Sequence, residues 1–460
     1  MNDLPAQITL DQWAERYRQL CDGGLREPWY GGPLARHVAD GDYRLLRLRY
    51  DNSAAALRLW NFLLTEESRL FKARQEGKKI IGTMKDLGTV PIMVYSLPNA
   101  IAFYPDGAWW VPCIMENTTR DLSIANSLGI DESFCPVRAM LGAFVACEHF
   151  PQPDLLICSV GATCDDFSAI AQRLASVGYP PFWWEIPHRR RPDPDEPAVT
   201  LPGGFAAPVS QVAFVKGELQ RIRRELSTIC SRELTDDMLA AGIRVANQVR
   251  GMLRELRQLV FTAPRCPLPA LELLIAEMLA IHYCSDRDQT LAVYQDLLNE
   301  VRRRVADNQG LFPADPARIF WVNPVADLRA MNLLEECGGR LCGTEFLFCH
   351  ALDEIPEDVP PMDALAQMAL ADPMVGSAGD RAMRICNDAR RLNAEAVLIS
   401  RIPGASHCAL EGQVIREMIE SELRLPVLEL EVPPLSDAVG PAIRTRIEAL
   451  VEAVRQRRAR

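Results

Sequence analysis

Short apolar and β-branched runs alternate along the first half of the chain with segments long enough to form helices. The runs are KKIIGTM (78–84), IAFYP (101–105), DLLICSV (154–160) and FWWEIP (182–187). Apolar runs of this length, bounded by glycine, proline or polar residues, are typical of strands that are buried on both faces. Because strands that alternate with helices pair in parallel through right-handed crossovers, the pattern predicts a parallel α/β sheet.

The same alternation returns in the last third of the chain. Its runs are RIFWVN (318–323), RLCGTEF (340–346), AVLISRI (396–402) and PVLELEV (426–432), with helical periodicity between them. We therefore expect a second α/β unit of the same plan, followed by a C-terminal helix.

Helical periodicity without strand-like runs precedes and separates these two units. We predict a helical N-terminal region over residues 1–78, a first α/β domain over 79–208, a helical segment over 209–315 and a second α/β domain with a C-terminal helix over 316–460. A chain of 460 residues has room for several domains of about 100 to 200 residues. Residues 188–208 are dense in proline, glycine and charge, which predicts a surface loop.

Charge and hydropathy exclude several classes of protein. The net charge of -11 argues against nucleic acid as the main partner, because phosphate binding needs cations clustered over a broad face. The most apolar segment, 268–284, contains Glu272 and Glu277 and is shorter than the roughly 20 residues of a membrane span, so we expect a buried or interface helix. The N-terminal residues 1–17 lack the apolar core of a secretory signal. We expect a cytoplasmic protein without a membrane span.

The chain contains 14 cysteines, yet none of them forms a C-x-x-C pair. That spacing disfavours zinc ribbons, thioredoxin-type redox sites and local ferredoxin motifs. Disulfides are rare in a reducing compartment, so most of these cysteines are expected to be reduced thiols. Cysteines that bind a metal here must come together from distant segments.

Three cysteines share one local setting, directly before a predicted helix. Cys135 lies in SFCPVRAMLGAF, where Pro136 opens the helix; Cys164 follows a strand in DLLICSVGATCDDF; Cys408 follows a strand in LISRIPGASHCALEGQ. A helix N-terminus favours the thiolate, which is the form that binds metal. Ligands also gather at the carboxyl ends of parallel strands. These three cysteines are therefore candidate metal ligands.

At these segments the chain resembles the subunits of 2-hydroxyacyl-CoA dehydratases and benzoyl-CoA reductases. Such subunits show a cysteine before a helix, here CPVRAMLG, then a strand that leads to Cys-Asp, here DLLICSVGATCD, and a third cysteine after a C-terminal strand. They also show segments similar to LPVLELEV, to RTRIEALVE and to RIFWVNPVADLRAMNLLEECGGRLCGTEF. The resemblance covers most of residues 78–460.

The resemblance implies an α/β fold with two flavodoxin-like parallel-sheet domains and a [4Fe-4S] cluster between them. It implies that Cys135, Cys164 and Cys408 bind this cluster and leave one iron for a non-cysteine ligand. Family members receive one electron from a separate ATP-dependent iron-sulfur activator protein. They form a ketyl radical of a CoA-thioester substrate, and they pair with a related second subunit. The chain has no GxxxxGK[ST] phosphate loop, which agrees with ATP being bound by a partner.

The chain departs from the family pattern at two places. Family members often have Pro-Glu-Glu at the position where residues 90–94 of this chain read VPIMV. The double-cubane branch has Gly-Glu-Thr-Thr-Cys-Asp-Gly at the position where this chain has SVGATCDDF. Dehydratase and reductase activity therefore both remain open, with the missing glutamates favouring a reductase or a divergent member. The alternatives are a structural partner subunit of such a complex and a double-cubane-cluster reductase of small molecules. The larger cluster would need further ligands, for which Cys158, Cys342 and Cys349 are candidates, although we expect them in the core or as surface thiols.

Polar residues near the cysteines have both a functional and a structural interpretation. His407 and Ser406 are candidate catalytic residues beside Cys408, as a proton donor and a hydrogen-bond donor, or else ordinary loop residues. Ser159 and Thr163 have the same two interpretations. Asp165 and Asp166 could orient the ligand loops, but we expect them to cap the N-terminus of the next helix. The run HRRR (188–191) is a candidate contact for CoA phosphates, although we expect a solvated loop. The tryptophan pairs 109–110 and 183–184 are candidates for lining an acyl pocket, or else core or interface residues.

Overall fold

Two parallel β-sheets form the core of the protein in a computed structural model. The structure describes residues 4–39, 43–84, 88–106, 118–282, 285–312, 315–346, 352–406, 410–433 and 438–460. Each sheet has four strands, in the orders β4-β3-β5-β6 and β10-β9-β11-β12. The predicted α/β fold with two flavodoxin-like parallel sheets is confirmed.

The first sheet consists of the four strands expected from the apolar runs. They are β3 (Lys79–Met84), β4 (Ala100–Phe103), β5 (Leu155–Gly161) and β6 (Phe182–Ile186), and every pair is parallel. In the sheet, β3 lies between β4 and β5. The chain first crosses from β3 to β4 on one side and then returns to β5 on the other side, so the direction of the crossovers reverses between β3 and β5. In open α/β sheets this reversal leaves a crevice at the carboxyl ends of the two strands.

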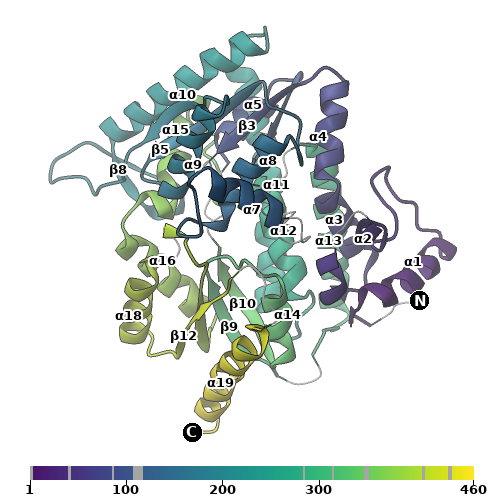
Figure 1. Ribbon diagram of the computed structural model, residues 1–460. Helices are drawn as coiled ribbons and strands as arrows, with labels where there is room; N and C mark the ends of the chain where they lie inside the picture. The colour runs from purple at the N-terminus through teal and green to yellow at the C-terminus, as the bar shows by residue number, and fades with distance from the viewer. Residues whose placement is uncertain are drawn as a thin grey trace.

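The second sheet repeats this topology. Its strands are β9 (Ala317–Val322), β10 (Gly339–Glu345), β11 (Ala396–Arg401) and β12 (Val427–Glu431), again all parallel. Here the reversal lies between β9 and β11. Figure 1 shows β3 and β5 in the upper part of the molecule and β9, β10 and β12 in the lower part.

Helices cover both faces of the first sheet. Alternate strand residues such as Ile81 and Ile157 pack against one set of helices, while Ile80 and Leu156 pack against the other. The first set is α5 (Val90–Tyr95), α10 (Val209–Ile229) and the start of α11 (Asp236–Thr262); the second is α4 (Glu66–Gln75), α7 (Thr118–Ser127), α8 (Ala139–Ala146) and α9 (Asp165–Ser176).

The long helix α11 connects the two cores. Leu239 and Ile243 in its first half belong to the core of the first sheet, whereas Leu253 and Leu256 in its second half belong to the core of the second sheet. The helices around the second core are α12 (Ala270–His282), α13 (Arg287–Ala306), α14 (Arg329–Glu336), α16 (Ala378–Arg391), α18 (Gly412–Glu422) and α19 (Gly440–Arg458). As expected, the described side chains of the apolar helix α12 are buried.

Helix α15 (Pro361–Ala371) packs outside the unit that its sequence position suggests. It follows β10, yet its buried face, which includes Leu365 and Met368, lies in the core of the first sheet, against α10 and α11. The two α/β units are therefore joined through α15 as well as through α11.

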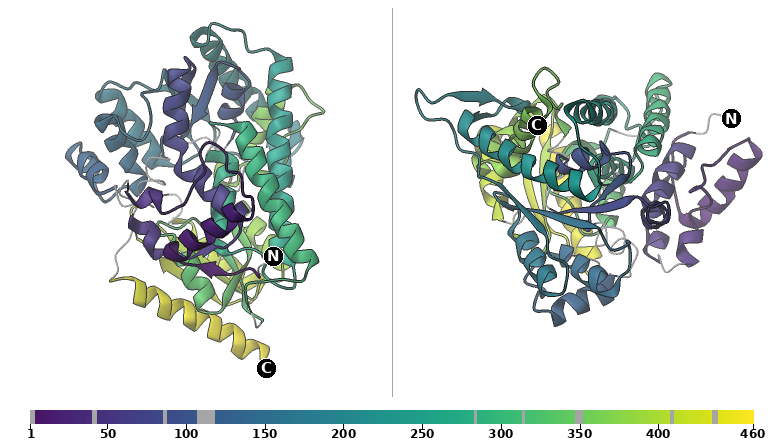
Figure 2. Two further views of the ribbon diagram at one scale, coloured as in Figure 1. Left: turned by 90° about the vertical axis from the view of Figure 1, so that its right-hand side faces the viewer. Right: turned by 90° about the horizontal axis from the view of Figure 1, so that it is seen from above.

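The N-terminal region packs against α12 and α13 and is mainly helical. Trp60 and Leu57, which lie in the last helix of this region, are fully buried in this packing. Its elements are β1 (Gln7–Ile8), α1 (Leu10–Asp22), α2 (Arg36–Ala39), the 3₁₀ turn η1 (Tyr43–Arg47), β2 (Tyr50–Asp51) and α3 (Ala54–Leu64), with β1 and β2 antiparallel. In the right-hand view of Figure 2 this region lies in purple at the right side of the molecule, and in the left-hand view α19 lies in yellow at the lower end.

The segment 188–208 differs from the predicted loop. It contains a small antiparallel hairpin, β7 (Ala198–Thr200) and β8 (Ala206–Pro208), around the turn η3 (Pro202–Gly204). Strands of three residues carry too little apolar pattern to be read from sequence. Among the described helices, none is both long and apolar enough to cross a bilayer.

Candidate functional site

Cys164 lies just beyond the carboxyl end of β5, as the sequence predicted. It is the N-cap residue of α9, so its thiol lies at a helix N-terminus, and it is half-buried. The turn that delivers it requires Gly161, which has φ +102, and a Cβ there would lie 2.2 Å from the carbonyl oxygen of Ile186. Because β5 flanks the crossover reversal, Cys164 is placed at the crevice of the first sheet.

Cys135 is also at a helix N-terminus, and it is half-buried as well. It is the N-cap residue of the 3₁₀ turn η2 (Pro136–Arg138), which continues directly into α8. Pro136 occupies the first turn, where its missing N–H is not needed. The predicted setting of Cys135 before a proline-initiated helix is confirmed.

The side chain of Asp166 brings three segments together. Its Oδ2 accepts hydrogen bonds from the backbone N–H of Ser406 at 3.0 Å and from the Ser406 hydroxyl at 2.9 Å. Its Oδ1 accepts from the backbone N–H of Cys135 at 3.5 Å, and the Cys164 thiol lies 3.6 Å from Oδ2. Asp166 is only 4% exposed, so these contacts are shielded from water. The expectation that Asp166 caps its own helix was wrong, because its carboxylate contacts the other two loops instead.

Gly404 holds the loop after β11 against the segment before Cys135. It has φ +79, and a Cβ at this position would lie 2.5 Å from the carbonyl oxygen of Phe134 and 2.9 Å from that of Glu132. A side chain at position 404 is therefore excluded both by backbone conformation and by space. The two loops come from different sheets, so this backbone contact lies between the two α/β units.

The structure thus brings Cys135, Cys164 and Ser406 together. The Cys164 Sγ and Ser406 Oγ atoms are 4.0 Å apart. His407 and Cys408 lie outside the described residues, so their assigned roles stay predictions.

Arg138 is a buried cation one turn after Cys135, and the sequence pattern did not single it out as a site residue. Its guanidinium donates to the carbonyl of Phe134 at 3.0 Å and to Oδ1 of Asn126 at 3.4 Å, so it fixes the turn that carries Cys135. Burial lowers the pKa of Arg138, and the neighbouring Cys135 and Asp131 oppose that shift. A guanidinium in this position favours the thiolate form of Cys135.

A second buried network fixes the loop after β11 from the other side. Arg381 of α16 donates to both carboxylate oxygens of Glu345 at 3.0 and 2.6 Å and to Oδ1 of Asn323 at 2.6 Å. It also donates to Glu411 at 2.6 Å. Burial opposes the charge of Arg381, but the two carboxylates outweigh that effect and raise its pKa. This network joins the carboxyl ends of β9 and β10 to the residues that follow the third cysteine.

Two cysteines that a larger cluster would need lie in apolar cores. Cys158, in β5, and Cys342, in β10, are both 0% exposed. Burial raises the pKa of the Cys342 thiol to about 12, which disfavours the thiolate. Both are core residues, as we expected; Cys349 lies outside the described residues.

The other polar candidates near the site have local partners. The Ser159 hydroxyl lies 3.3 Å from that of Thr163, which agrees with a role in the turn. Arg189 of the HRRR run is 3% exposed and donates to the carbonyls of Leu370 at 2.6 Å and Asp372 at 3.1 Å. The expectation of a solvated loop was therefore wrong for Arg189.

The next two arginines of this run, Arg190 and Arg191, pair with Glu196 and Asp380. The structure thus gives no support for a phosphate-binding role of the run. Trp184 is a core residue, 1% exposed, and Trp183 is half-buried, whereas Trp109 and Trp110 lie outside the described residues.

Comparison with known proteins found a matching family. A family model described as 2-hydroxyglutaryl-CoA dehydratase, D-component, matches residues 95–454. The matched range includes Cys135, Cys164 and Cys408. No curated protein matches the chain.

Proposed function

The chain belongs to the family of 2-hydroxyglutaryl-CoA dehydratase D-components, and on that premise we propose that it is the iron-sulfur subunit of an enzyme acting on a CoA thioester. The proposed reaction is the radical dehydration of a 2-hydroxyacyl-CoA, or the related reduction of an aryl-CoA. The observation that carries the proposal is the convergence of the Cys135, Cys164 and Ser406 segments on Asp166.

The donor set fits a [4Fe-4S] cluster bound by Cys135, Cys164 and Cys408. Cys135 and Cys164 occupy the N-cap positions of their helices, where the helix dipole and free N–H groups favour thiolates. Cys408 is two residues along the chain from Ser406, and two trans peptide units span at most about 7 Å. When bound, such a cluster supplies single electrons and a Lewis-acidic iron that is open to a non-cysteine ligand.

The protein's own contribution is to fix the three loops. The Asp166 carboxylate accepts hydrogen bonds from the loops of Cys135 and Ser406. These hydrogen bonds stabilise the carboxylate beside the thiol of Cys164. Arg381 fixes the residues after the third loop through Glu411. The Ser406 hydroxyl donates its proton to Asp166 and holds its oxygen 4.0 Å from the Cys164 sulfur, where that oxygen can accept a hydrogen bond from a thiol or from substrate.

The proposed partners follow from the same reaction. A related second subunit completes the complex, and a separate ATP-dependent iron-sulfur activator protein supplies the electron, because this chain lacks a phosphate loop. We place the complex in the cytoplasm, where the thiols of the described residues would stay reduced. The buried positions of Cys158 and Cys342 favour a single cluster over a double cubane.

The test is anaerobic iron and sulfide analysis with EPR spectroscopy, together with turnover of 2-hydroxyacyl-CoA and aryl-CoA thioesters in the presence of the activator. We expect about four irons per chain, loss of the EPR signal in Cys135→Ala, Cys164→Ala and Cys408→Ala, and retention in the matched core variant Cys230→Ala. Turnover that survives Cys164→Ala in the intact complex would show that this chain is a structural partner subunit.

A further inference from the structure

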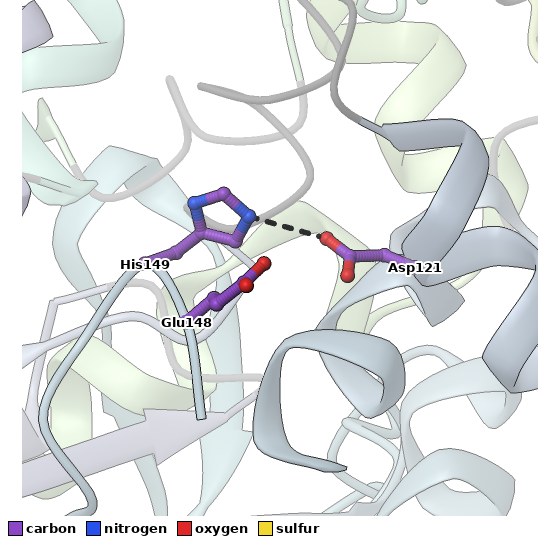
Figure 3. Close-up of side chains that lie close together, drawn as sticks. All are labelled: Asp121, Glu148 and His149. Carbon is purple, nitrogen blue, oxygen red and sulfur yellow. Dashed lines mark ion pairs between the residues drawn. The ribbon is translucent and has the colours of Figure 1, made fainter. Parts of the chain in front are cut away.

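A second group of metal-binding side chains lies apart from the cysteine loops. Asp121 belongs to α7, and Glu148 and His149 follow the end of α8. One ligand atom from each of the three residues lies within 4.8 Å of the others. Figure 3 shows the two carboxylates and the imidazole directed toward one another.

Two backbone features bring these residues together. Gly142 of α8 lies against α7 so closely that a Cβ there would be 2.4 Å from the Cα atom and the carbonyl oxygen of Asp121. Cys147 then ends α8 in the left-handed conformation, with φ 58, and His149 also has a positive φ of 70. The chain therefore turns back at the end of α8 and directs His149 to the start of α7.

Asp121 is the buried member of the group. Its side chain is 1% exposed, and its Oδ2 accepts no hydrogen bond from the described residues. The neighbour of this oxygen is Nε2 of His149, at 3.3 Å. A buried carboxylate oxygen that accepts no hydrogen bond is costly unless a positive charge lies beside it, so Oδ2 of Asp121 favours a cation at this position.

The donor set selects the class of cation. One imidazole nitrogen with two carboxylates suits Zn²⁺ and similar divalent transition metals, which accept nitrogen and oxygen ligands together. The other imidazole nitrogen, Nδ1, faces Oε2 of Glu67 at 3.8 Å. A carboxylate on the far nitrogen is the arrangement that orients metal-binding histidines.

We propose that Asp121, Glu148 and His149 form a divalent transition-metal site that is independent of the cysteine site. An ion bound there ties the start of α7 to the end of α8. Since α8 continues directly from the turn that begins at Cys135, the site would stabilise the helix pair that carries this cysteine.

The competing explanation is an imidazolium ion without metal. Burial disfavours the charged form of His149, but the carboxylates of Asp121 and Glu67 outweigh it and raise its pKa to about 9. A proton and a metal ion would therefore compete for Nε2, and Arg120, whose Nη1 lies 2.8 Å from Glu148 Oε1, competes for that carboxylate. Metal binding measured directly distinguishes the two explanations.

The experiment titrates Zn²⁺ into the anaerobically purified full chain against a chromophoric chelator. The variants are His149→Gln and Asp121→Asn, and the matched control is His188→Gln, which removes a histidine outside the group. We expect wild type and His188→Gln to bind one more Zn²⁺ per chain than the other two, since binding to thiols is common to all four. Equal Zn²⁺ binding in all four proteins would overturn the proposal and leave the imidazolium.

Two further measurements keep the proposal testable if a ligand variant does not fold. Arg120→Gln leaves all three ligands in place and frees Glu148, so it should bind Zn²⁺ more tightly than wild type. Glu148→Gln changes a partly exposed side chain and should weaken Zn²⁺ binding by more than the roughly 10- to 100-fold that loss of an outer-shell partner causes. Unchanged affinity in both would contradict a site at this position.

Discussion

Asp166 and Ser406 are 240 residues apart in sequence, yet the Asp166 carboxylate accepts two hydrogen bonds from Ser406, at 3.0 Å and 2.9 Å. This contact joins the loop after β11 of the second sheet to the helix that follows Cys164 in the first. Because a third contact reaches the backbone N–H of Cys135, one buried carboxylate organises all three cysteine segments.

Replacing Asp166 should therefore disrupt the site as well as the fold around it. In Asp166→Ala the N–H and hydroxyl of Ser406 lose a charged acceptor, at a cost of about 3 kcal/mol for two such hydrogen bonds. We expect a lower thermal midpoint and reduced iron content after anaerobic reconstitution. The control is Asp165→Ala, which changes the exposed neighbour. An Asp166→Ala protein with wild-type iron content would show that the carboxylate does not organise the loops.

Gly404→Ala tests the close contact between the two loops. The new Cβ would lie 2.5 Å from the carbonyl oxygen of Phe134, so the loops must separate. Gly178→Ala is a matched control, because Gly178 also has a positive φ, +101, but nothing lies within 4 Å of the position that a Cβ would take there. We expect both variants to lose about 1 kcal/mol from backbone strain and only Gly404→Ala to lose iron as well. Equal iron content in the two variants would exclude a role for the contact.

Arg381→Met should destabilise the second sheet and the loop after β11. The change leaves the carboxylates of Glu345 and Glu411 without their buried partner, which typically costs about 3 to 5 kcal/mol. Thermal unfolding of this variant is compared with that of Arg390→Met, which removes an exposed arginine from the same helix. Similar unfolding midpoints for the two variants would show that the buried network contributes little.

Glu272 predicts a pH dependence of stability. It is 0% exposed and accepts hydrogen bonds from the backbone N–H of Asp51 at 2.9 Å and from Trp60 Nε1 at 3.1 Å. Burial, with a contribution from Asp51, raises its pKa from 4.5 to about 8. Below pH 4.5 the group is protonated in both the folded and the unfolded state, so it imposes no penalty. Between pH 4.5 and about 8 the carboxyl group of Glu272 is ionised in the unfolded state but protonated in the folded state. In this range it lowers the equilibrium constant for folding by roughly tenfold per pH unit.

The neutral variant Glu272→Gln removes that penalty. Its thermal midpoint should exceed that of wild type more at pH 9 than at pH 5. Glu277→Gln is the opposite control, because Glu277 is equally buried but pairs with Arg257, so its neutralisation should destabilise the protein at both pH values. The same offset for Glu272→Gln at both pH values would mean that Glu272 is already ionised in the folded protein.

The strands of both sheets could be predicted from sequence because each is a continuous apolar run with polar or glycine ends. The N-terminal positions of Cys135 and Cys164 on their helices were predictable for a similar reason, since proline after Cys135 and a strand before Cys164 are local signals. The hairpin of β7 and β8 gave no such signal, because each strand has only three residues.

Contacts between distant residues were not predictable in the same way. The carboxylate of Asp166 lies in the first turn of α9, where its local sequence also suits a helix cap, and only the fold shows that Ser406 lies beside it. The group of Asp121, Glu148 and His149 depends on the close packing of Gly142 against α7, which single-sequence periodicity does not reveal. The adjacent residues Glu148 and His149, just after a helix, were the one local sequence signal for this group.

The most direct test of the central claim is a crystal structure of the anaerobically purified protein with iron located by anomalous scattering. Our account predicts a single iron-sulfur cluster bonded to the sulfur atoms of Cys135, Cys164 and Cys408, next to the Asp166–Ser406 contact. Iron bound elsewhere, or these three sulfur atoms without a shared cluster in a protein that contains iron, would contradict it.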